Sequence, residues 1–205
     1  MRRASFLYPC LHIKLFSIVL VFTYTKEQMS LETELSKFWQ WAGMTPENYS
    51  ENRGLGEWEL EYPNWDDLYK EVNEVIALLN KEFNHDLAQL LVYALAIDSE
   101  SGTVLQRIAD KLESKLRFVR KAIFSDQPQA RWQIAELLGN TAVEDQEKLL
   151  VNLINRDKDK YVKRRALLSL SKVNHAKATE FAKSYLKDPD PFLKLVSKQI
   201  INANA

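Results

Sequence analysis

Glycine, proline and cysteine are scarce in this chain, which has five glycines, six prolines and one cysteine among 205 residues. Few positions are therefore left for turns, while leucine, alanine, lysine, glutamate and glutamine are abundant, a composition typical of helices. The single cysteine, Cys10, excludes an internal disulfide bond and a cysteine-based metal site. It also fits a reducing compartment, so we expect a cytoplasmic protein.

A net charge is missing as well, because 28 basic residues balance 28 acidic ones. The whole molecule thus has no net field that would steer it to nucleic acid or membrane. The charges are nevertheless distributed unevenly. Residues 47–82 hold ten acidic and three basic side chains, and residues 156–198 hold twelve basic and five acidic ones. This asymmetry either orients a partner during encounter or reflects solvated helix faces.

Residue clusters with catalytic or metal-binding spacing are also absent. None of the three histidines has a second histidine or cysteine at the spacing of metal ligands. Gly54 and Gly56 lack the Lys-Ser/Thr pair of a phosphate-binding loop, and no nucleophile elbow occurs. We therefore predict that the protein is not an enzyme and that it binds no metal and no small-molecule cofactor.

The first 28 residues differ in composition from the rest of the chain. Arg2 and Arg3 precede an apolar run from Leu15 to Tyr24. Such a run is too short for a membrane-spanning helix, which needs about 20 residues, so we predict no membrane span. No small-residue cleavage site follows it. Two interpretations of residues 1–28 stay open: a signal or anchor, and a mis-assigned start with Met29 as the true first residue.

Apolar residues recur with the period of a helix over most of the remaining chain. Over residues 29–65 we predict an N-terminal cap, made of a short helix and an acidic, aromatic loop from Asn48 to Trp65. Over residues 66–205 we predict a helical repeat region. Its helices include the segments Val143–Ile154 and Ala176–Leu186.

Three similar stretches follow one another at steps of 31 residues. They begin at Asp126, Asp157 and Asp188, and their sequences are "DQPQARWQIAELLG", "DKDKYVKRRALLSLS" and "DPDPFLKLVSKQIIN". A basic residue accompanies each aspartate, at Arg131, Lys163 and Lys194. A hairpin of two helices this short cannot bury its apolar stripe alone, so successive hairpins must stack.

This pattern resembles HEAT repeats over about residues 126–202. The resemblance implies an all-α fold, a short right-handed α-solenoid of HEAT-like helix hairpins, here with an aromatic, acidic N-terminal cap. It also implies that the repeated aspartates and basic residues serve packing between successive units.

The first candidate site is the acidic, aromatic segment of the cap. Large aromatic rings beside unpaired carboxylates suit an interface with a basic protein. Alternatively, the rings close the open end of the solenoid. The residues of this predicted partner-binding site are Glu57, Trp58, Glu59, Glu61, Tyr62, Trp65, Asp66 and Asp67.

The second candidate site is a basic cluster in the repeats, which on a concave wall could contact phosphates. HEAT-like DNA glycosylases look superficially similar, but Asp157 and Asp159 dilute the charge here, and a solvated face is the competing interpretation. The residues of this alternative nucleic-acid site are Arg131, Trp132, Lys160, Lys163, Arg164 and Arg165.

We predict a non-catalytic protein-binding module whose partner is a basic protein. A bacterial immunity protein that neutralises a basic toxin, such as a nuclease, fits the acidic segment. The alternatives are a nucleic-acid-binding HEAT-like protein, resembling a DNA glycosylase and using the C-terminal basic helices, and a scaffold without a single ligand.

Overall fold

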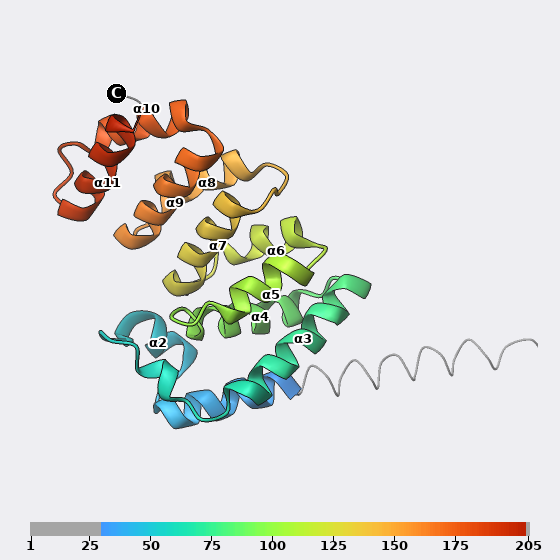
Figure 1. Cartoon of the computed structure of the whole chain (residues 1–205). Helices are drawn as coiled ribbons and strands as arrows, with labels where there is room; N and C mark the ends of the chain where they lie inside the picture. Colours follow the sequence, from blue (N-terminus) through green and yellow to red (C-terminus); the bar gives the residue numbers. More distant parts are fainter. Residues whose placement is uncertain (1–29, 204–205) are drawn as a thin grey trace, which may run out of the picture.

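The computed structural model describes residues 30–203, whose helices pack one after another along the molecule (Figure 1). Within this range there is no strand, and no helix has the length and apolarity of a membrane span. The predicted leader, residues 1–28, lies outside the described residues. The elements in chain order are a helix over residues 30–42, α2 (Pro46–Asn52), the 3-10 helix η1 (Trp58–Glu61), α3 (Trp65–Lys81), α4 (His85–Ile97), α5 (Thr103–Lys111), α6 (Lys115–Ala122), α7 (Pro128–Asn140), α8 (Gln146–Arg156), α9 (Lys160–Val173), α10 (His175–Tyr185) and α11 (Pro191–Asn202).

The repeat region has two layers of helices. α9 packs against α7 on one side and α11 on the other, and α4 extends this layer because it packs on α7. α8 and α10 form the second layer, each in contact with α9 (Figure 1). The predicted all-α fold and α-solenoid are therefore confirmed.

The starts of α7, α9 and α11 define the repeat register. Their N-cap residues are Gln127, Asp159 and Asp190, at steps of 32 and 31 residues. The side chains of Asp159 and Asp190 accept hydrogen bonds from backbone N–H groups of the first helical turn, which favours a helix start. Pro128 and Pro191 stand at the first helical position, where a missing N–H costs nothing.

This register corrects the predicted equivalence of Asp126 with the other two aspartates. The carboxylates of Asp157 and Asp188 each accept from the N–H two residues on, at 2.9 Å. In the first copy it is the Ser125 hydroxyl that accepts from Gln127 N–H, at 3.0 Å. Asp126 lies one position further along, because the step to the second copy is 32 residues rather than 31.

The predicted loop from Asn48 to Trp65 is wrong in part, because most of it is helical. α2 begins where the Thr45 hydroxyl accepts from Asn48 N–H and Pro46 occupies the first turn. The irregular parts are residues 62–64, before α3, and the turn before η1, where Gly54 and Gly56 have φ of 76° and 102°. Only glycine adopts such angles without strain.

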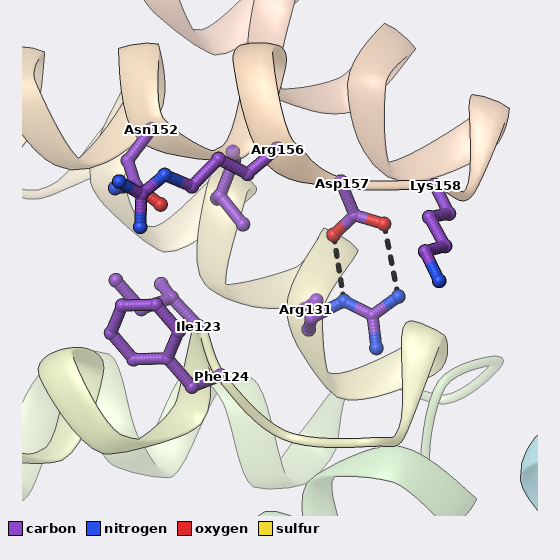
Figure 2. Close-up of a pocket in the computed structure, with 8 residues that line it drawn as sticks. Ile123, Phe124, Arg131, Asn152, Arg156, Asp157 and Lys158 are labelled. Carbon is purple, nitrogen blue, oxygen red and sulfur yellow. Dashed lines mark hydrogen bonds and ion pairs between the residues drawn. The ribbon is translucent and has the colours of Figure 1, made fainter.

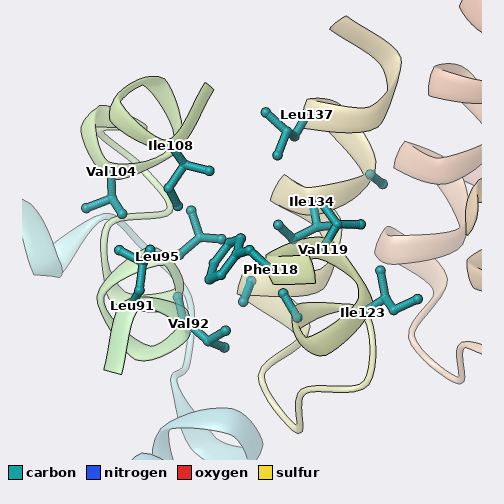
Figure 3. Close-up of a cluster of buried hydrophobic side chains, with 14 of the residues drawn as sticks. Leu91, Val92, Leu95, Val104, Ile108, Phe118, Val119, Ile123, Ile134 and Leu137 are labelled. Carbon is teal, nitrogen blue, oxygen red and sulfur yellow. The ribbon is translucent and has the colours of Figure 1, made fainter. Parts of the chain in front are cut away.

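One continuous hydrophobic core runs from Leu31 in the first helix to Ile200 in α11. Figure 3 shows how it passes from the N-terminal helices into the repeats: the buried ring of Phe118 in α6 lies between Leu95 of α4 and Ile134 of α7. Cap and repeats thus share their apolar interior. The division into a cap of residues 29–65 and a repeat region of residues 66–205 stays a prediction.

α7 and α9 approach each other closely at Gly139. A Cβ atom at this position would lie 2.7 Å from the Cβ and Oγ atoms of Ser169 and 2.9 Å from its Cα atom. The glycine inside α7 and the small serine on α9 therefore set how close the two helices can come.

Candidate functional site

The aromatic residues of the cap form a cluster around Phe38, which is fully buried. Its ring centroid lies 5.1 Å from that of Tyr62 and 6.0 Å from that of Trp65. Tyr62 is buried, and the Trp65 indole N–H donates to the Glu59 carbonyl at 2.9 Å. These two predicted interface residues therefore contribute mainly to the interior of the cap.

Glu59 is also internal, and the expectation that the acids of this segment are unpaired is wrong for it. Its side chain is 1% exposed, accepts from the Tyr49 hydroxyl at 2.9 Å and is bound by the Arg53 guanidinium. Arg53 donates further to Glu100 at 2.8 Å and to the Gly56 carbonyl at 3.0 Å. Burial, with the charge of Glu59, raises the pKa of Tyr49 above its ordinary range. A buried carboxylate needs such partners.

The four other predicted acids, Glu57, Glu61, Asp66 and Asp67, are exposed. Within residues 30–203 none of them makes an ion pair or a side-chain hydrogen bond. Asp66 and Asp67 lie in the first turn of α3, where a negative charge favours the helix dipole. The cap therefore presents four exposed carboxylates without an ion pair among these residues, although the charge of Lys37 attracts that of Asp67.

A pocket of about 360 Å³ lies beside these acids, lined by Trp41, Ala42, Met44, Trp58 and Glu61. The Trp41 and Trp58 ring centroids are 5.8 Å apart, and Trp41 is 40% exposed. Trp41 and Met44 were not among the predicted partner-binding residues. The available signal was the position of Trp41 outside the apolar stripe of Leu31, Leu35 and Phe38.

The turn between α2 and η1 exposes a leucine. Leu55 stands between two glycines and is 99% exposed, and Leu60 in η1 is also exposed. The turn is fixed on both sides, because Arg53 donates to the Gly56 carbonyl and the Trp58 indole N–H donates to the Arg53 carbonyl at 3.1 Å. A protruding apolar side chain on a fixed turn suits an anchor for a protein partner.

The predicted basic residues of the repeats come together at the N-terminal ends of α7 and α9, but most of their charges are compensated. Arg131 donates two hydrogen bonds to Asp157, at 2.7 and 2.9 Å (Figure 2). Lys160 pairs with Asp188 at 3.3 Å, and Arg165 pairs with Glu136.

Aromatic contacts hold Arg164 and Trp132, two further members of this basic cluster. Arg164 lies over the rings of Tyr161 and Phe192, at 5.1 and 5.0 Å. Trp132 meets Tyr161 edge to face at 5.5 Å. Lys163 makes no ion pair or side-chain hydrogen bond among the described residues. The resemblance to HEAT repeats correctly implied a packing role for Arg131 and Asp157, whereas the ion pair with Asp188 is made by Lys160 rather than Lys163.

A second pocket, of about 350 Å³, lies between the end of α6 and the end of α8 (Figure 2). Its lining includes the exposed ring of Phe124 and the cations of Arg156 and Lys158. These two cations have no side-chain partner in the described part of the chain. Over the same residues no three histidine, cysteine or acidic side chains are grouped so that they could hold a metal ion.

A stack of helix hairpins with ion pairs between successive units defines an α-solenoid, here with an aromatic, acidic surface at its N-terminal end. Residues 116–200, from α6 into α11, match the family model described as HEAT repeats, which confirms the resemblance to HEAT repeats over this part of the chain. No curated protein and no solved structure matches the chain. HEAT repeats are generally protein-interaction modules, which is compatible with a non-catalytic binding role.

Proposed function

We propose that the protein binds a basic protein partner through the exposed carboxylates of its cap, without catalysis. One observation carries this proposal: the exposed acids Glu57, Glu61, Asp66 and Asp67 make no ion pair or side-chain hydrogen bond within residues 30–203, whereas the cations of the basic cluster are largely engaged inside the chain. Charges already paired contribute little to a new contact, while unpaired carboxylates select a basic surface and speed its encounter.

The apolar groups beside these acids supply the buried part of such an interface. Trp41 lines the same pocket as Glu61, and the exposed Leu60 precedes Glu61 in the chain. Aromatic and aliphatic anchors surrounded by charges are typical of the residues that dominate binding energies.

A specific form of this function is toxin immunity. A basic toxin such as a nuclease meets phosphate through cations, and an acidic cap would cover them. We propose that this chain acts as such an immunity protein, in the cytoplasm. The uncompensated acids of the cap and the single cysteine support this assignment.

A charge reversal tests the proposed surface. Glu57→Lys with Glu61→Lys should weaken binding to a panel of basic proteins, including nucleases, by about tenfold or more, since each lost charge contact costs about 1 kcal/mol. The matched control reverses two exposed acids of the repeats, Glu144 and Glu180, and changes the net charge equally. Equal loss in both double variants, or none in either, would remove the cap from the function.

Nucleic-acid binding is the second candidate, favoured by the cations of Arg156, Lys158 and Lys163, which make no ion pair within residues 30–203. A titration of labelled duplex against salt tests it, because phosphate contacts give an affinity that falls steeply with salt. Affinity abolished by Lys163→Glu with Arg164→Glu would favour this candidate over the acidic cap.

A further inference from the structure

The pocket lined by Trp41, Ala42, Met44, Trp58 and Glu61 has the composition of a site for a cation. It is open to solvent and has a volume of about 360 Å³, within the range of pockets that hold ligand groups. Two indole rings and a thioether form its walls, and a single carboxylate lies among them. Indole faces attract cations, most strongly where water is excluded.

Contacts within the chain hold the residues that line this pocket in place. Trp58 stacks on Phe38 at 6.2 Å and is tied through its indole N–H to the Arg53 carbonyl. Met44 is placed by the end of the first helix, where its N–H donates to the Trp39 carbonyl at 3.1 Å and Gly43 has φ of 64°. This is the left-handed helix ending that glycine favours. A fixed pocket loses little side-chain freedom on binding.

The carboxylate decides what the pocket can hold. Glu61 makes no ion pair or side-chain hydrogen bond with other described residues. An apolar group filling the pocket would remove water from this carboxylate and leave it unpaired, which is costly. A cation would instead pair with the carboxylate and lie against the indole faces.

We propose that this pocket receives the side chain of an arginine of the basic partner, an inference that rests on the proposed function. Arginine fits better than lysine because its planar guanidinium can stack on an indole while its N–H fork binds a carboxylate. The guanidinium is also less strongly hydrated than an ammonium group, so it loses less on entering an aromatic pocket. Glu61 selects the charge, and Trp41 and Trp58 select the flat shape.

The test is a titration with blocked single amino acids, followed through the indole N–H signals of the tryptophans by NMR. N-acetyl-arginine amide should shift the Trp41 signal, which the Trp41→Ala variant assigns. N-acetyl-lysine amide should bind at least threefold more weakly. N-acetyl-citrulline amide, which keeps the arginine shape without its charge, should bind at least tenfold more weakly. Equal shifts by arginine and citrulline would overturn the proposal and indicate an apolar or hydrogen-bonding pocket.

Two variants separate the effect of the Glu61 carboxylate on arginine binding from the effect of another exposed acid of the cap. Glu61→Gln should weaken arginine binding at least fivefold, whereas Glu57→Gln, an exposed acid outside the pocket lining, should leave it within twofold. Unchanged arginine binding in Glu61→Gln would overturn the proposal. This pair of variants decides the question even if Trp41→Ala does not fold.

The panel of basic proteins distinguishes failure of the pocket from failure of the proposed function. Binding that is lost in the Glu57→Lys, Glu61→Lys double variant but kept in Trp41→Ala and Glu61→Gln would overturn the pocket and leave the proposed function standing. Arginine binding at Trp41 together with no binding to any basic protein would support the pocket and count against the proposed function.

Discussion

Gly139 is the position where a single methyl group should disturb the stack of repeats most directly. Its substitution by alanine would place a Cβ atom 2.7 Å from the Cβ atom of Ser169 and 2.9 Å from its Cα atom. Real Cβ atoms do not come this close to other heavy atoms. Because the obstacle includes the backbone of α9 rather than a flexible side-chain end, the two helices must move apart.

The size of the effect follows from two opposing contributions. Alanine is favoured over glycine inside a helix by about 1 kcal/mol. Overpacking of an ordered interior costs about 1–3 kcal/mol. Since α7 and α9 cannot yield locally, we expect the upper part of that cost and a net loss of about 1–2 kcal/mol. For a chain of this size the midpoint of thermal unfolding should fall by about 2–8 °C.

Urea and thermal unfolding followed by circular dichroism measure this loss. The second variant, Ser169→Gly, removes the facing Cβ atom, so the double variant should be more stable than the sum of the single losses predicts, with a coupling of about 0.5–2 kcal/mol. A Gly139→Ala protein as stable as the parent, or more stable, would refute the close approach of α7 and α9 at this point.

Further predictions concern the ion pairs and one buried acid. Arg131→Gln, which leaves the 3% exposed Asp157 without its partner, should lower the free energy of unfolding by about 2–3 kcal/mol, whereas Lys160→Gln, at a 44% exposed site, should cost less than about 1 kcal/mol in the same urea titration. Burial raises the pKa of Asp98, so the folded chain holds this proton to higher pH than the unfolded chain does, and the contribution of Asp98 to stability declines as pH rises from about 4. The free energy of unfolding of the parent, relative to that of Asp98→Asn, should therefore fall between pH 4 and pH 7 in urea titrations at four pH values. A difference between the two proteins that does not change with pH would contradict this reasoning.

The helical repeats could be predicted from the sequence because their signal is periodic. The apolar positions Ala130, Val162 and Leu193 each stand three residues after an N-cap, and all three are buried. Because the pattern recurs, each helix hairpin has to bury its apolar side against a neighbouring hairpin. The register of the aspartates was harder, because a serine in the first copy does what a carboxylate does in the others.

The cap could be predicted only in outline, because its contacts join residues without a repeat. The pairing of Glu59 with Arg53 and the contact between Trp41 and Trp58 depend on how the turn around Leu55 folds back. Residue type alone made Glu59 look like Glu57, although one is buried and the other exposed. The basic cluster was misleading for the same reason: its partners Asp188 and Glu136 lie about 30 residues away in the chain.

The ion pairs between successive units weaken towards the C-terminus. The Arg131–Asp157 pair is bidentate and mostly buried, the Lys160–Asp188 pair is longer and more exposed, and α11 leaves Phe192 and Leu195 open to water. The stability of a solenoid is a sum over the contacts between neighbouring repeats, so the repeats with the weakest contacts should unfold first. We therefore expect the hairpin of α10 and α11 to unfold first. A chain that is truncated or unfolded at this end should keep a folded cap with its exposed carboxylates.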